Sequence, residues 1–195
     1  LFLGWSLGAN DAANVFGTAV GTRMVQFKTA AIVCSIFVIL GAIISGSGTT
    51  ETLGKLGSIN ALPGAFAACV AAGLSVYIMT KSGLPVSTTQ AIVGAIIGWN
   101  LYTGSSTNIQ VLITILGTWV LCPIIAGLLS MLFFVITKNF LQKAKLHILR
   151  LDAYTRTALL LVGAFGAYSL GANNIANVMG VFVPISPFTD INILN

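Results

Sequence analysis

The sequence predicts an all-α polytopic membrane protein that is built as an inverted repeat with discontinuous helices. Three observations lead to this fold class: an apolar composition, uncharged runs long enough to cross a bilayer, and a motif that occurs twice. Of the 195 residues, 56% are hydrophobic and 7% are charged, whereas roughly a quarter of an average soluble domain is charged. This composition excludes an ordinary soluble domain and makes the lipid bilayer the expected surroundings of the chain.

Long uncharged runs place the membrane helices along the chain. About 20 mainly apolar residues cross the hydrocarbon core as a helix, and unpaired peptide groups are costly in lipid, so the spans must be helical. We expect spans near residues 1–22, 29–45, 64–80, 84–102, 109–137 and 157–184.

The basic residues predict which side of the membrane each loop occupies. Five of the nine lie in segment 138–156, namely Lys138, Lys143, Lys145, Arg150 and Arg156. Cytoplasmic loops are rich in Lys and Arg, so we interpret this segment as a cytoplasmic loop of a plasma-membrane protein, with no nucleic acid as partner. Alternating the spans from there leaves only Lys55 outside.

A twelve-residue motif divides the chain into two repeats. Residues 6–17 recur 163 positions later as residues 169–180, with nine of twelve identical. Five predicted crossings separate the copies, so they enter the membrane from opposite sides, as in the inverted repeats of secondary transporters. We expect a first repeat over 1–137, the basic loop, and the start of a second repeat over 157–195, the rest of which would lie beyond this chain.

Polar residues recur every four positions within each copy of the motif. These are Ser6, Asn10 and Asn14 in the first copy and Ser169, Asn173 and Asn177 in the second. One interpretation is hydrogen bonding between closely packed helices. The other, favoured by the flanking glycines, is a break in each helix that frees carbonyls to form an oxygen cage for a small cation.

Asp11 is the only acidic residue well inside a predicted span. Burying an ionised carboxylate in a membrane costs at least about 2.5 to 3.5 kcal/mol, so such residues are usually functional. We expect Asp11 to act in the cation site, the alternative being an exposed helix end.

The segment around Ser87, Thr88 and Thr89 predicts a helix start with exposed hydroxyls. Pro85 suits the first turn of a helix, where backbone N–H groups have no helical partner. Such a terminus favours anions and suits phosphate, whose oxygens accept several hydrogen bonds. Ordinary capping by Ser or Thr is the alternative.

The sequence gives no support for an enzyme. The sole histidine, His147, lies in the basic loop, and Cys34, Cys69 and Cys122 lie singly in separate apolar runs, typical of small core residues. A channel would need a continuous polar path, whereas the polar residues here gather in matched patches.

Together these motifs resemble those of the PiT family of inorganic phosphate transporters. The likeness rests on Gly8-Ala9-Asn10-Asp11 with Ala13-Asn14 and Gly17-Thr18, on the weaker copy from Gly171, and on Pro85-Val86-Ser87-Thr88-Thr89. It implies a symporter carrying phosphate with sodium or protons and no further cofactor. The implied phosphate-binding residues are Ser87, Thr88, Thr89, Gln90 and Asn174, and the implied sodium-binding residues are Asn10, Asp11, Asn14, Asn173 and Asn177.

Three departures from the family pattern favour sodium over protons. Asn174 stands where Asp is common, Gln90 where His is common, and Val38 where animal members have Glu. Each removes a protonatable group. The alternatives are a proton-coupled carrier of phosphate or metal phosphate, and a permease for sulfate or another oxyanion. A homodimer is an expectation from transporters in general.

Overall fold

The structure is a computed structural model that describes residues 1–56, 62–84, 86–143 and 147–182. Within these ranges the chain forms helices and no strands. The helices are α1 (Phe2–Gly21), α2 (Phe27–Ser45), α3 (Ser47–Gly54), α4 (Leu62–Lys81), α5 (Thr88–Thr103), α6 (Ile109–Lys143) and α7 (Ile148–Met179). The all-α polytopic fold class is therefore confirmed.

Six of these helices overlap the six predicted spans, and the short α3 was not expected. Segment 138–156, predicted as a loop, is helical over residues 138–143 and 148–156, because α6 and α7 extend beyond their apolar parts. Four of them, α2, α4, α6 and α7, are long and apolar enough to cross a membrane. The predicted place of Pro85 in a first helical turn, and the predicted end of the last span at residue 184, lie outside the described residues.

The helix interruptions lie at other places than the Asn-rich motifs. The helical structure is interrupted at Gly46, between α2 and α3, and again between Lys81 at the end of α4 and Thr88 at the start of α5. The expected break within each motif is wrong, because α1 and α7 run unbroken through both copies. The backbone of a helix pairs within itself, so the Asn amides are free to bond to other helices without breaking it.

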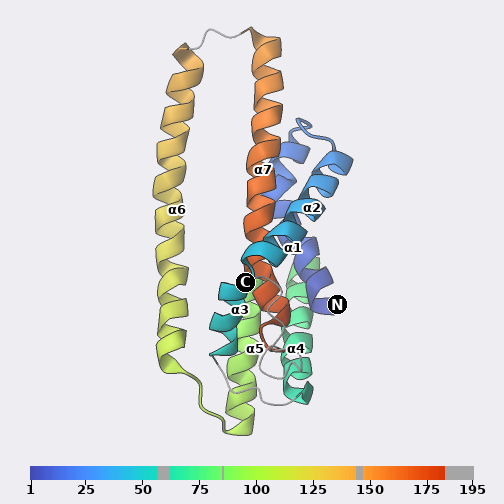
Figure 1. The fold of residues 1–195 in the computed structure, drawn as a ribbon, viewed down its shortest axis with the longest axis vertical. Coiled ribbons are helices and arrows are strands. Elements are labelled where there is room, and N and C mark those ends of the chain that lie inside the picture. The colour runs from blue at the N-terminus through green and yellow to red at the C-terminus, as the bar shows by residue number, and fades with distance from the viewer. Residues whose placement is uncertain (57–61, 85, 144–146, 183–195) are drawn as a thin grey trace.

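The two motif helices run in opposite directions. In Figure 1, α1 starts at the chain's N-terminus and rises, whereas α7 descends past it, with the α4–α5 hairpin beside them. α6 runs alongside this group from the end of α5 and bounds it on one side (Figure 1).

Glycines bring α2 and α7 into close backbone contact. A Cβ at Gly41 would meet the carbonyl of Tyr168, and a Cβ at Gly171 would meet the carbonyl of Val38. This crossing fixes how far α7 is shifted along its axis relative to α2, and with it the position of the motif that α7 carries. Two apolar clusters complete the packing, one centred on α4 and α5 and one between α1, α2 and α7.

Candidate substrate and ion site

The start of α5 carries the hydroxyl groups that the sequence singled out. Ser87 is the N-cap residue, and its hydroxyl oxygen accepts a hydrogen bond of 3.3 Å from the backbone N–H of Gln90. The capping interpretation therefore holds for Ser87. Thr88 and Thr89 follow in the first turn, Thr88 buried at 4% exposure and Thr89 half-buried. Their hydroxyls point to other helices, as the next contacts show.

Asp11 joins the two copies of the motif to the start of α5. One oxygen of its carboxylate, Oδ2, accepts a hydrogen bond of 3.0 Å from the Asn174 amide and one of 3.3 Å from the Thr88 hydroxyl. Asp11 and Asn174 occupy equivalent positions in the two copies. The contact therefore joins the two copies of the motif at equivalent positions.

Asn177 continues the network on the α7 side. Its Nδ2 lies 2.8 Å from Asn174 Oδ1, 3.1 Å from Thr89 Oγ1 and 3.4 Å from Thr88 Oγ1. An amide nitrogen has two hydrogens, so it cannot serve all three acceptors fully at once. Asn177 is 1% exposed. The amide therefore has three close acceptors to choose between, all within one cluster.

The remaining asparagines of the motif have different surroundings. The Asn10 amide donates to the carbonyl of Val86 at 3.1 Å, which ties α1 to the segment that precedes α5. Asn14 is exposed on α1. Asn173 is exposed and lines a cavity that neither Asn10 nor Asn14 reaches. The structure thus brings Asp11, Asn174 and Asn177 together with the α5 threonines, and leaves Asn14 apart.

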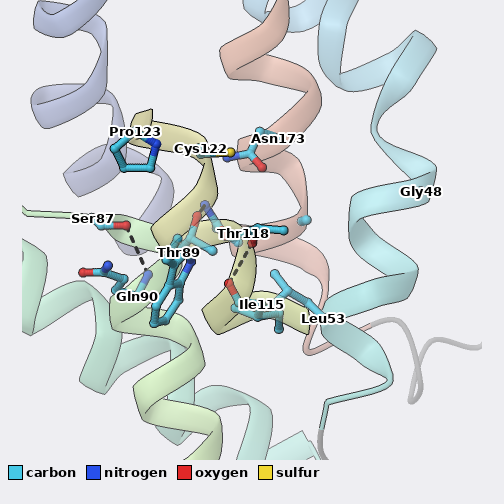
Figure 2. Close-up of a pocket in the computed structure, with 13 residues that line it drawn as sticks. Gly48, Leu53, Ser87, Thr89, Gln90, Ile115, Thr118, Cys122, Pro123 and Asn173 are labelled. Atoms are coloured by element: carbon cyan, nitrogen blue, oxygen red, sulfur yellow. Dashed lines mark hydrogen bonds between the residues drawn. The ribbon is translucent and has the colours of Figure 1, made fainter. Parts of the chain in front are cut away.

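A cavity of about 490 Å³ opens beside this cluster (Figure 2). Four helices enclose it. Its polar wall carries Ser87, Thr89 and Gln90 from α5 and Asn173 and Asn177 from α7. The opposite wall comes from α6, with Gly48 and Leu53 of α3 at its edge.

Sequence reasoning missed the wall that α6 supplies. It consists of Ile115, Thr118, Trp119, Cys122 and Pro123. The available signal was a proline in the interior of a long apolar span, which marks a break in the backbone bonding of the helix. The interpretation of the cysteines as core residues holds for Cys34, which is buried, whereas Cys122 is exposed on the cavity.

The arrangement contains one carboxylate surrounded by neutral donors and acceptors. The oxygens of Asp11 and the threonine hydroxyls are the hard ligands that small oxygen-seeking cations prefer. The hydroxyls and first N–H groups of α5 are donors of the kind that bind oxyanions at helix starts. His147, by contrast, is an exposed N-cap residue of α7 and takes no part in the cluster.

Fold and site together define a helical membrane protein with a polar cavity, a candidate binding site, between its helices. The model of the phosphate transporter family matches residues 7–155, which is most of the chain. The chain belongs to the phosphate transporter family.

Individual relatives support this assignment. The chain is 36% identical over 151 residues to a Pyrococcus furiosus protein named as a phosphate permease, covering 72% of this chain and 37% of that protein. It is 32% identical over 155 residues to the sodium-dependent phosphate transporter of Plasmodium falciparum, covering 74% and 23% of the two chains. The matched part of the chain therefore covers less than two fifths of the length of each of these relatives.

A solved structure shares the fold. The structure described as the sodium-dependent phosphate transporter superposes with a TM-score of 0.75 at 24% sequence identity. The match covers 100% of this chain and 67% of that one. The likeness establishes that the helices described here adopt the arrangement of a known membrane transporter.

Proposed function

We propose that the protein carries inorganic phosphate across the plasma membrane by secondary active symport, driven by a sodium gradient. The observation that carries this proposal is the contact of Thr88 with Asp11 at 3.3 Å. It puts a hydroxyl-bearing helix start, suited to an anion, directly beside the one carboxylate of the cluster, suited to a cation. An anion site and a cation site that share one hydrogen bond are physically linked.

This proximity gives a reason for coupled binding. A phosphate at the start of α5 would be repelled by the Asp11 carboxylate, and at an effective dielectric constant of about 20 two unit charges 4 Å apart interact by about 4 kcal/mol. A sodium ion at Asp11 offsets that repulsion. Each ligand therefore improves the site for the other, and the coupling is reciprocal.

On the phosphate side, we assign binding to Ser87, Thr88, Thr89, Gln90 and Asn174. The exposed Ser87 and Gln90 and the half-buried Thr89 all line the cavity. On the sodium side, we assign Asp11 as the charged ligand, with oxygens drawn from Asn10, Asn173 and Asn177. The sequence-based prediction also included Asn14, but Asn14 is exposed and lies outside the cluster, so it supports this assignment no further. Sodium is preferred to protons because the cluster is built of amides and hydroxyls around a single titratable group.

The inverted repeat is part of the same proposal. The opposite directions of α1 and α7 and the contact between Asp11 and Asn174 support it. In this arrangement the basic segment 138–156 is cytoplasmic, and a two-fold axis near Asp11 relates the halves of the binding site.

The test is uptake of radiolabelled phosphate by the full-length protein in proteoliposomes, with sodium and proton gradients imposed separately. We expect uptake that requires inward sodium and persists when the pH gradient is collapsed. Uptake that follows the pH gradient in sodium-free buffer would favour the proton-coupled carrier of phosphate or metal phosphate. Competition by sulfate equal to that by unlabelled phosphate would favour a general oxyanion permease.

A further inference from the structure

Residues 138–143 at the end of α6 and 148–156 at the start of α7 form a basic tip. It carries four exposed cationic side chains, those of Lys138, Lys143, Arg150 and Arg156. Arg156 is paired with Asp152 at 2.9 Å, whereas the other three have no acidic partner among the residues that the structure describes. The basic tip therefore presents positive charge that no described part of the chain neutralises.

The basic tip extends beyond the other helices at its end of the molecule. In Figure 1 the end of α6 and the start of α7 reach past the loop that joins α1 to α2. All described residues from 138 to 150 are exposed, so no other described helix covers the tip there. With 35 residues at 1.5 Å each, α6 is about 52 Å long, whereas the hydrocarbon core is about 30 Å thick. The helix is thus long enough to carry the basic tip out of the hydrocarbon core and into the headgroup layer.

Large apolar side chains are exposed among these cations. They are Phe140, Leu141, Ile148, Leu149 and Tyr154. Phe140 lies one turn before Lys143, and Tyr154 one turn after Arg150, so cationic and aromatic residues share helix faces. A loop surrounded by water accounts for the cations. It does not account for so many exposed apolar side chains, which gather where a protein meets a partner or a membrane.

This combination suits the boundary between lipid headgroups and acyl chains. Aromatic side chains are enriched at this depth of a membrane, and Lys and Arg bury their apolar stems there while the charged group reaches the headgroups. Arg pairs well with phosphate because its planar group offers two parallel N–H donors. The cytoplasmic leaflet holds anionic lipids and attracts basic segments that adjoin membrane helices.

We propose that the basic tip lies in the headgroup layer of the cytoplasmic leaflet and binds the phosphate groups of anionic lipids. Lys138, Lys143 and Arg150 pair with the lipid phosphates, while their apolar neighbours enter the acyl region. This surface is separate from the candidate phosphate site at the start of α5, since none of its residues lines that cavity. The inference rests on the proposed cytoplasmic position of segment 138–156 and does not depend on which ion drives transport.

Titration of the purified full-length protein with phosphatidylserine tests this proposal. Bound lipid is counted by native mass spectrometry, with zwitterionic phosphatidylcholine as the comparison. When Lys138→Gln, Lys143→Gln and Arg150→Gln are combined, we expect phosphatidylserine affinity to fall about fivefold for each cation removed. Phosphatidylcholine binding should stay the same. The control is Lys55→Gln, which removes one charge from an exposed lysine beside α3 and should leave phosphatidylserine binding unchanged.

Two further variants separate charge from structure. Lys138→Arg, Lys143→Arg and Arg150→Lys combined keep every cation and should keep the affinity for phosphatidylserine. Ile148→Ser with Leu149→Ser also keeps the cations but should weaken the binding of both lipids.

Three outcomes would overturn the proposal. They are unchanged phosphatidylserine affinity in the neutral triple variant, lost affinity in the charge-keeping variant, and displacement of the lipid by inorganic phosphate, which would make the tip a site for free phosphate. Lipid binding is measured without transport, so failure of the proposed symport would show only in the uptake of radiolabelled phosphate.

Discussion

At the scale of single residues, the three hydroxyls at the start of α5 have three different tasks. Ser87 caps the helix by accepting from the Gln90 backbone N–H, Thr88 donates to Asp11, and Thr89 accepts from Asn177. From the sequence they were one run of equal candidates. The difference arises because successive residues of a helical turn point about 100° apart, so each meets a different neighbour.

The role of Asp11 is testable by removing its charge and little else. Asp11→Asn keeps the size of the side chain and one oxygen, and Asn174 already stands at the equivalent place in α7. We expect sodium affinity to fall by about 2 to 4 kcal/mol, the scale of one charge interaction in a partly screened site. Phosphate affinity should fall with it through linkage. The measurement is a sodium titration of phosphate binding to purified full-length protein.

Asp152→Asn supplies the matched control for that experiment. Asp152 forms a solvent-exposed ion pair of 2.9 Å with Arg156 one turn along α7, outside both motifs. Exposed pairs of this kind contribute little to stability. We expect Asp152→Asn to bind phosphate with the sodium dependence of the parent protein. If Asp11→Asn shows that same sodium dependence, Asp11 is not an ion ligand.

At the scale of helices, the position of the site depends on how tightly α2 and α7 approach. Gly41 and Gly171 face carbonyls of the partner helix, Tyr168 and Val38 respectively, with no room for a Cβ. Small residues at such crossings let membrane helices approach closely. Because Asn174 and Asn177 lie within two turns of Gly171, the same contact determines which residues of α5 they face.

Gly171→Ala is therefore expected to destabilise the protein, although alanine ordinarily favours a helix over glycine. Overpacking of a close contact typically costs about 1 to 3 kcal/mol, and α7 should also shift enough to weaken phosphate binding. Gly127→Ala in α6, where a Cβ meets nothing within 4 Å, should raise stability slightly. The measurement is thermal unfolding of both variants in detergent. Equal unfolding midpoints for Gly171→Ala and Gly127→Ala would contradict the proposed tight crossing of α2 and α7.

At the scale of the whole molecule, the distribution of basic residues predicts one orientation in the membrane. The end of α6 and the start of α7, which carry the basic segment, lie far from α3 in Figure 1. Lys143 ends α6, and Lys55 directly follows α3. The positive-inside rule then assigns the two lysines to opposite sides of the membrane.

Labelling of single cysteines tests this orientation. In a background without Cys34, Cys69 and Cys122, Lys55→Cys should react with an impermeant maleimide added to intact cells, and Lys143→Cys should react only after permeabilisation. Retained phosphate uptake by each variant is the control for folding. Reaction of both cysteines from outside would contradict the orientation and the cytoplasmic assignment of segment 138–156.

The sequence by itself determined that the chain is helical and apolar enough for a membrane, roughly where each long helix lies, and that two equivalent motifs exist. These features follow from composition, from turn and cap residues close in the chain, and from direct repetition, all of which are local. It also identified Asp11, because a lone carboxylate in an apolar span is costly wherever it lies. It was wrong about a helix break within each motif, since whether an Asn serves its own backbone or another helix depends on what packs beside it.

Only the tertiary structure decided which of the polar residues meet. Asp11 and Asn174 are 163 residues apart, and their contact depends on the glycine crossing of α2 and α7 and on the antiparallel course of α1 and α7. The same holds for the wall that α6 supplies, since Thr118 and Trp119 follow no motif and face the cavity only because of how α6 runs beside the other helices. Helical periodicity fixes which residues share a face, but the direction of that face is set by packing between helices, and packing depends on contacts far apart in the chain.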